Sequence, residues 1–198
     1  MKRIFLFTDV SLNPELKLGV GAYLVVPASL LELSSPRIER SELAERVVVR
    51  RFEGTSSTRL EVQTVLWALE DFRNELQVSG PGKLIVFSDS QCVAGLLGRR
   101  PGLEANDFHS KRTNRPLRNF SLYRTFYELH DELGFEVIKV AGHTSSCSHD
   151  TVHRLFSYVD REARQTLNLW MGECEVESLE PINKMRRKFR PHNPGTSR

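Results

Sequence analysis

Two stretches decide the fold: residues 3–9, RIFLFTD, and residues 83–89, KLIVFSD. Each is a short apolar run, typical of a buried β-strand, and each ends in a hydroxyl residue followed by an aspartate. Open α/β sheets place their site residues at the carboxyl ends of strands. If these two strands are neighbours, Asp9 and Asp89 lie close together, and like charges at short distance favour an intervening proton or cation. The alternative is that each aspartate only caps a turn or a helix.

The rest of the pattern predicts an α/β protein whose sheet contains strands of mixed direction. The first three strands follow one another through short links, which is typical of an antiparallel meander, before helices and strands alternate. Residues 28–45 interrupt the meander as a polar insertion, with a short helix expected around 41–45. Strands are expected at residues 3–8, 19–26, 47–52, 83–87 and 135–140, and helices at 58–77, 91–97, 117–133 and 153–171.

The length of 198 residues fits one domain, expected over residues 1–175, followed by a basic, flexible tail at 176–198. No apolar run approaches the roughly 20 residues that span a bilayer, and the first residues lack the apolar core of a secretory signal. The three cysteines are scattered without a CxxC pair, so we expect reduced thiols in a cytoplasmic protein. We expect a monomer, with no membrane partner and no small-molecule cofactor.

The net charge is only +3, but the cations are unevenly distributed. They cluster in the polar connection at residues 99–118 and again at residues 184–190. Such clusters suit a polyanionic partner, although a solvated basic face has the same pattern. In the connection, Pro101-Gly102 and the acidic Glu104 and Asp107 argue against a regular basic helix.

Three further polar residues are weak signals when each is taken alone. Glu61 follows Thr58 by three positions, so it could simply complete a capping box at the start of the helix expected at 58–77. Asp160 falls inside the last expected helix, and His143 lies in a Gly-His-Thr loop after the last strand. A surface position is the ordinary alternative for that histidine.

Taken in order, the motifs resemble those of the type 1 ribonuclease H family over roughly residues 3–170. The matching segments are FTDVS at 7–11, STRLE at 57–61, SDSQCV at 88–93, NRPLRNFSL at 114–122, VAGH at 140–143 and DREAR at 160–164. The resemblance implies a ribonuclease H-like mixed five-stranded sheet, with three antiparallel strands, then parallel additions, and helices on both faces.

The resemblance also implies a site in which four carboxylates hold two Mg²⁺ ions, with Mn²⁺ as an alternative. Asp9 would bridge the two ions, and Asp160 would complete the site that activates water. Glu61 and Asp89 would hold the ion that stabilises the leaving 3′-oxygen, as in other two-metal phosphodiester hydrolases. His143 would manage the attacking water or the departure of product.

For substrate, the resemblance implies an RNA/DNA hybrid, whose 2′-hydroxyl distinguishes RNA from DNA. The side chains expected to contact it all form hydrogen bonds: Ser11, Ser57, Thr58, Ser90, Gln91 and Asn119. The chain departs from the family pattern at Val10, where a glycine is usual, and in the long loop before Asp160. Because of that loop, Asp150 is an alternative fourth carboxylate.

These observations favour a metal-dependent endonuclease that hydrolyses the RNA strand of RNA/DNA hybrids. Two alternatives stay open. One is a non-catalytic domain that binds RNA or hybrids, and the other is a related nuclease acting on DNA. A serine hydrolase is disfavoured because the chain has no Gly-x-Ser-x-Gly motif.

Overall fold

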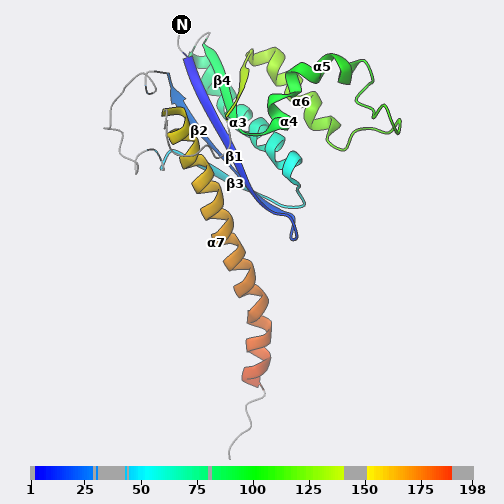
Figure 1. The fold of residues 1–198 in the computed structure, drawn as a ribbon. Helices are drawn as coiled ribbons and strands as arrows, with labels where there is room; N and C mark the ends of the chain where they lie inside the picture. The colour runs from blue at the N-terminus through cyan, green and yellow to red at the C-terminus, as the bar shows by residue number, and fades with distance from the viewer. Residues whose placement is uncertain are drawn as a thin grey trace, which may run out of the picture. The chain divides into compact units, whose positions relative to one another are not determined.

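The computed structural model describes residues 3–28, 30, 43, 45–79, 82–140 and 151–188. Figure 1 shows the order of the elements along the chain. The five strands are β1 (Arg3–Asn13), β2 (Leu18–Pro27), β3 (Val48–Phe52), β4 (Lys83–Ser88) and β5 (Glu136–Lys139). The helices are α3 (Ser57–Ser79), α4 (Gln91–Ala94), α5 (Leu96–Glu104), α6 (Phe120–Leu133) and α7 (Thr151–Lys188).

The five strands form one mixed sheet in the order β3-β2-β1-β4-β5. β1 and β2 pair antiparallel, as do β2 and β3, whereas β4 adds parallel to β1 and β5 adds parallel to β4. The predicted meander with parallel additions is therefore confirmed. β1 is the central strand, so it carries its side chains into the interior on both faces.

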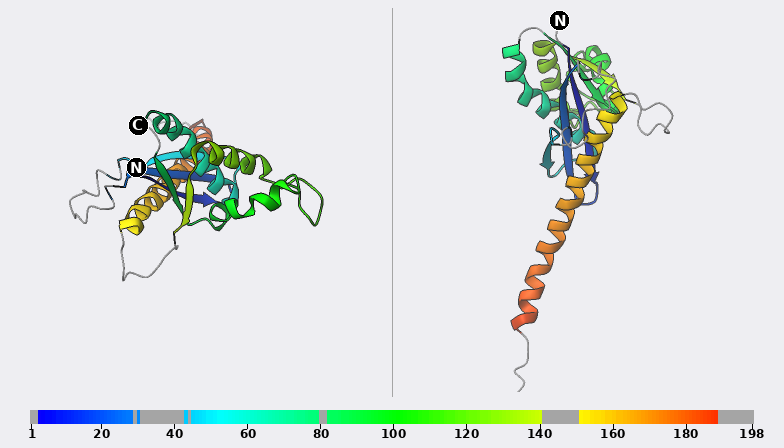
Figure 2. Two further views of the ribbon diagram at one scale, coloured as in Figure 1. Left: turned by 90° about the horizontal axis from the view of Figure 1, so that it is seen from above. Right: turned by 90° about the vertical axis from the view of Figure 1, so that its left-hand side faces the viewer.

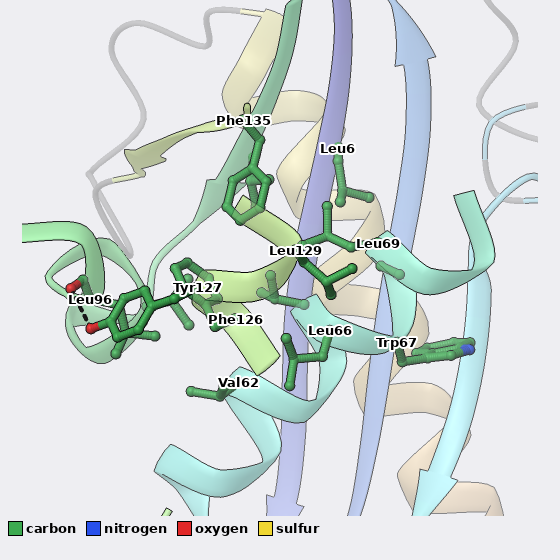
Figure 3. Packing of buried hydrophobic residues seen from close by; sticks show 14 of the residues in the cluster. Leu6, Val62, Leu66, Trp67, Leu69, Leu96, Phe126, Tyr127, Leu129 and Phe135 are labelled. Atoms are coloured by element: carbon green, nitrogen blue, oxygen red, sulfur yellow. Dashed lines mark hydrogen bonds between the residues drawn. The ribbon is translucent and has the colours of Figure 1, made fainter. Parts of the chain in front are cut away.

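One face of the sheet packs against α3 and α6. Because side chains alternate along a strand, Leu6 of β1 points to this face while Phe5 and Phe7 point to the other. Figure 3 shows Leu6 of β1 in one buried cluster with Leu66 of α3 and Leu129 of α6. This cluster is the larger part of the hydrophobic core and fixes both helices against the sheet.

The opposite face is covered by the first part of α7. Phe7 and Phe87 stack here, with ring centroids 4.8 Å apart, and Leu155 and Val159 of α7 are buried. Figures 1 and 2 show α3 and the start of α7 on opposite sides of the sheet. Helices thus lie on both faces, as expected.

β1 is longer than predicted. The sequence predicts a strand that leaves the core at residue 8, but β1 continues to Asn13 because it forms a long antiparallel ladder with β2. Asp9 consequently lies within the strand, opposite Ala22, rather than after its end. Its parallel pairing with β4 nevertheless stops at Phe7, opposite Phe87, so Asp9 lies just beyond the end of that ladder.

The helix predicted to end at Gly98 is divided and longer: α4 ends at Ala94, and α5 continues through Gly98 and Pro101. Glycine and proline usually end helices, and proline removes one backbone hydrogen bond. Contacts with α6 offset this cost. Arg100 pairs with Asp131, and the Tyr127 hydroxyl donates to the Leu96 carbonyl at 2.8 Å (Figure 3).

Two other boundaries differ from the prediction. α6 begins at Phe120 rather than near 117, and the Leu117 amide donates to the Phe108 carbonyl in the preceding loop. α7 continues to Lys188, well past the predicted end near Met171, through a segment rich in helix-forming Glu, Leu, Lys and Arg. Most of the 28–45 insertion, including most of the helix expected at 41–45, lies outside the described residues.

The contacts within the chain define two compact units, residues 1–167 and residues 168–198. The sheet, the helices α3 to α6 and the first part of α7, up to Leu167, belong to the first unit. The predicted boundary between 175 and 176 stays a prediction. In the described part of the chain, no helix has the length and apolarity required to cross a bilayer.

Candidate active site

The two strands that the sequence singled out are neighbours, and their acidic residues share one pocket. Asp9 lies two residues beyond the last β1–β4 pair, and Asp89 directly follows the last residue of β4. Because β1 and β4 run in the same direction, both carboxylates lie at the same end of this parallel strand pair. The lining residues are Thr8, Asp9, Val10, Glu61, Ser88 and Asp89.

Asp9 is the buried member of this group. Its side chain is only 8% exposed, and its pKa is raised from 3.8 to about 8. Burial is the main cause, and the negative charge of Asp89 is the next. The Val10 amide donates to Asp9 Oδ1 at 2.8 Å and opposes the shift. A carboxyl group in this position holds a proton near neutral pH unless a cation replaces it.

Asp160 comes to Asp9 from the first part of α7. Asp160 raises the pKa of Asp9 both through its negative charge and through a side-chain contact within hydrogen-bonding range. Two carboxyl groups can bond directly only when a proton lies between them. Arg164, one turn further along α7, donates to Asp160 Oδ1 at 2.7 Å. The structure thus brings Asp160 against Asp9, whereas Asp150 lies outside the described residues.

Glu61 enters from α3 and is held by two hydroxyl groups. The Ser57 hydroxyl donates to Glu61 Oε1 at 3.2 Å, and the Ser90 hydroxyl donates to Oε2 at 2.5 Å. The Thr58 capping box does not form, because the helix already begins at Ser57. The carboxylate therefore bonds both to Ser57 at the start of its own helix and to Ser90 in the loop after β4.

The donor set suits a hard divalent cation. Asp9, Glu61, Asp89 and Asp160 all offer carboxylate oxygens, the ligands that Mg²⁺ and Mn²⁺ prefer. Within the described residues, no three or more His, Cys, Asp or Glu side chains are already arranged as a ligand group. Glu61 instead bonds to two serines, and Asp160 to Arg164. A cation at Asp9 would take the place of the proton that its raised pKa favours, so the residues fit such an ion by chemistry and proximity.

The predicted substrate contacts occupy several positions. Ser57 and Thr58 are exposed at the start of α3, and Ser11 is half-buried in β1. Gln91 is exposed at the start of α4, where its Oε1 accepts a hydrogen bond from Lys139 Nζ at 2.6 Å. The last two, Ser90 and Asn119, are buried.

Asn119 precedes α6, and its buried Oδ1 has no hydrogen-bond partner among the described atoms. His143 lies outside the described residues. The sequence suggested no role for Arg164, although its spacing of four from Asp160 within a helix is a visible signal for an ion pair.

The basic connection is a folded loop rather than a loose one. Phe108 is buried and anchors it, the Ser110 amide donates to the Arg115 carbonyl, and His109 pairs with Pro116 across it. The acidic residues that argued against a basic helix are both used in ion pairs. Glu104 pairs with Arg100 at 2.7 Å and Asp107 with Arg124 at 2.6 Å.

These pairs leave a group of cations exposed. Four of them form no ion pair with any residue that the structure describes: Lys111, Arg112, Arg115 and Arg118. We call this group the loop cations. Arg99, in contrast, donates to the carbonyl and the sulfur of Cys92.

The mixed sheet, with acidic residues at the end of its central parallel pair, defines a ribonuclease H-like α/β protein. The family model for RNase H matches residues 1–167, and the chain belongs to this family. No curated protein matches the sequence significantly.

Solved structures support the fold. A foamy viral protease-reverse transcriptase, solved in complex with dsDNA, aligns with a TM-score of 0.54 and 13% identity, covering 82% of this chain and 93% of that chain. An RNase H1, LC11, isolated from compost by a metagenomic approach aligns with a TM-score of 0.52 and 10% identity, covering 84% and 99%. At these identities the likeness concerns the fold alone.

Proposed function

We propose that this chain is a metal-dependent endonuclease that hydrolyses the RNA strand of RNA/DNA hybrids. One observation carries the proposal: in a member of the RNase H family, Asp9 is buried against Asp89 and Asp160 so that its pKa is raised to about 8. Like charges are rarely brought together in a protein without a compensating ligand. A purely structural role for these residues does not account for that cost.

Asp9, Glu61, Asp89 and Asp160 would hold two Mg²⁺ ions, with Mn²⁺ as an alternative. When bound, such ions generate a nucleophile from water and stabilise the charge on the attacking and leaving oxygens. The chain's own residues orient the site: the Val10 amide fixes Asp9, and the hydroxyls of Ser57 and Ser90 fix Glu61.

The loop cations would contact the phosphate backbone of the substrate. Their positive charge is not neutralised within the described part of the chain, and the loop that carries them is anchored by Phe108. Binding through such contacts weakens as salt rises, because each neutralised phosphate releases counterions. This gives the proposal a second, independent readout that does not depend on cleavage.

The test is a cleavage panel with purified full-length chain and Mg²⁺ or Mn²⁺, using an RNA/DNA hybrid, duplex DNA and branched DNA. We expect cleavage of the RNA strand of the hybrid alone, and we expect Asp9→Asn to reduce it to background while the circular dichroism spectrum stays unchanged. Cleavage of DNA substrates instead would assign a related DNA nuclease. Tight hybrid binding without cleavage by the wild type would assign a binding domain.

A further inference from the structure

Ser90 lies between two residues of the candidate site, Asp89 and Gln91, yet it is nearly inaccessible. Only 3% of its surface is exposed, whereas both of its neighbours are exposed. A side chain at this depth is poorly placed to meet the 2′-hydroxyl of a substrate. Its role therefore has to be found among its contacts inside the protein.

The Ser90 hydroxyl accepts one hydrogen bond and donates another. Its oxygen accepts the Val93 amide at 3.1 Å, which caps the start of α4. Its proton is therefore free to point elsewhere, and it is donated to Glu61 Oε2 at 2.5 Å. Bonds from a hydroxyl to a carboxylate are among the short, strong class. The Ser90 amide is itself fixed, because it donates to Ser88 Oγ at 3.2 Å.

These bonds connect two separate parts of the fold. Glu61 belongs to α3, whereas residues 88–90 belong to the end of β4 and the turn that carries Asp89. We propose that Ser90 is a positioning residue that ties Glu61 to the β4–α4 turn and so sets the placement of Glu61 relative to Asp89. This inference rests on the proposed function, in which both carboxylates hold metal.

Ser57 offers an internal comparison. It donates to the other oxygen of the same carboxylate, but over 3.2 Å and from an exposed position where water competes for both groups. Of the two hydroxyls, only that of Ser90 is shielded from solvent. Its removal leaves a charged oxygen short of a partner that water cannot easily replace.

The experiment uses the full 198-residue chain. Mn²⁺ is titrated by calorimetry without nucleic acid, and kcat and KM are measured separately on an RNA/DNA hybrid. Ser90→Ala should weaken Mn²⁺ binding and lower kcat, each by about 10- to 100-fold, as is usual when a metal-ligating group is deprived of its hydrogen-bond partner. KM for the hybrid should stay within about threefold, and Ser57→Ala should cost only about two- to threefold in kcat.

Three further variants separate this role from simple loss of the helix cap or of a buried hydroxyl. Ser90→Gly keeps most of the capping preference but has no hydroxyl, so it should behave like Ser90→Ala. Ser90→Thr keeps both bonds and should restore kcat and Mn²⁺ affinity. Thr64→Val removes a buried hydroxyl of α3 that has no partner among the described atoms, and it should leave both unchanged.

The outcomes distinguish this inference from the proposed function. If wild type and Ser90→Ala bind Mn²⁺ equally, Ser90 does not position Glu61, whatever the substrate. If only KM for the hybrid rises, Ser90 contacts substrate and the inference is overturned. Wild-type chain that binds Mn²⁺ but does not cleave hybrids contradicts the proposed function alone, and the Mn²⁺ comparison still decides the role of Ser90. Wild-type chain that binds no Mn²⁺ contradicts both.

Discussion

The acidic pocket and the basic loop differ in whether their acidic side chains are paired with cations. In the pocket, Asp9 is buried and faces Asp89 and Asp160. Burial is the main reason that its pKa rises to about 8, and the negative charges of Asp89 and Asp160 raise it further. In the loop, Glu104 and Asp107 are both consumed in ion pairs that hold the structure together. The loop thus satisfies its acidic groups internally and presents the loop cations outward. In the pocket, Asp9 instead faces two carboxylates, so an added cation would relieve the repulsion there directly.

The largest effect should appear in the pH dependence of stability in metal-free protein. The pKa of Asp9 is higher in the folded state, about 8, than its ordinary value of 3.8. The folded chain therefore holds the proton more tightly, and this contribution is present below pH 4 and lost as the pH rises through 8. The free energy of unfolding should fall by up to about 1.4 kcal/mol per pH unit in that window.

Asp9→Asn is the matched control, because asparagine cannot ionise. Urea unfolding at intervals of pH should show a flatter profile for this variant. Added Mn²⁺ should raise the melting temperature of wild type at pH 8, and not that of Asp9→Asn. Parallel pH profiles for the two proteins would remove the contrast between pocket and loop.

The second-largest effect should follow the loss of Phe108, the buried side chain that anchors the basic loop. Phe108 is 6% exposed and packs against Tyr127, with Arg124 above its ring. Phe108→Ala should lower the free energy of unfolding by about 3 kcal/mol, because it removes a buried aromatic anchor. Phe120→Ala, at a nearby residue that is 37% exposed, should cost much less. Equal destabilisation of the two variants in urea would mean that the loop has no core of its own.

A third prediction separates the loop cations from the paired ones. Replacing Lys111, Arg112 and Arg115 together by alanine should weaken hybrid binding and reduce the slope of log K against log salt. The slope should fall by about 0.9 for each phosphate that these side chains neutralise in the wild type. Arg100→Ala is the control, since its guanidinium already bonds to Asp131 and Glu104. Fluorescence anisotropy over a series of salt concentrations measures both, and equal slopes would argue against the distinction.

The smallest effect should come from Arg164, which forms an ion pair with Asp160. The Arg164 side chain is 52% exposed, and its partner Asp160 lies four residues earlier in α7, so the two form an ion pair on the helix surface. Arg164→Gln should change the free energy of unfolding by no more than about 0.5 kcal/mol. A decrease above about 2 kcal/mol in urea denaturation would show that the pocket depends on this pair for its stability, well beyond what an exposed pair contributes.

The sequence predicted the sheet and the position of its acidic residues because those rest on local patterns. The apolar runs before Asp9 and Asp89 are short, continuous and β-forming, and the order of the elements fixes how they pair. Five strands and the main helices were confirmed on this basis. The pairing of Asp9 with Asp160 across one face of the sheet was available only through the resemblance to a family.

The errors have a common physical cause, which is that tertiary contacts override local preference. Pro101 and Gly98 predict a break, yet α5 passes through both because Arg100 and Leu96 are held by α6. The hydrogen bond between Ser90 and Glu61 joins residues 29 positions apart, and no spacing pattern in the sequence predicts it. The resemblance to the family placed Ser90 among the expected substrate contacts, and its burial could not be read from its residue type.

The two outer strands of the sheet have a consequence for how the chain behaves at high concentration. β3 has five residues and β5 has four, and each carries charged side chains: Arg50 and Arg51 on β3, Glu136 and Lys139 on β5. An open sheet edge is a template for the backbone of another molecule, and shortness and charge are the usual protection. The exposed apolar residues on these strands are Val48, Val49 and Ile138. Replacing the neighbouring charged residues with neutral ones should therefore promote self-association at these edges.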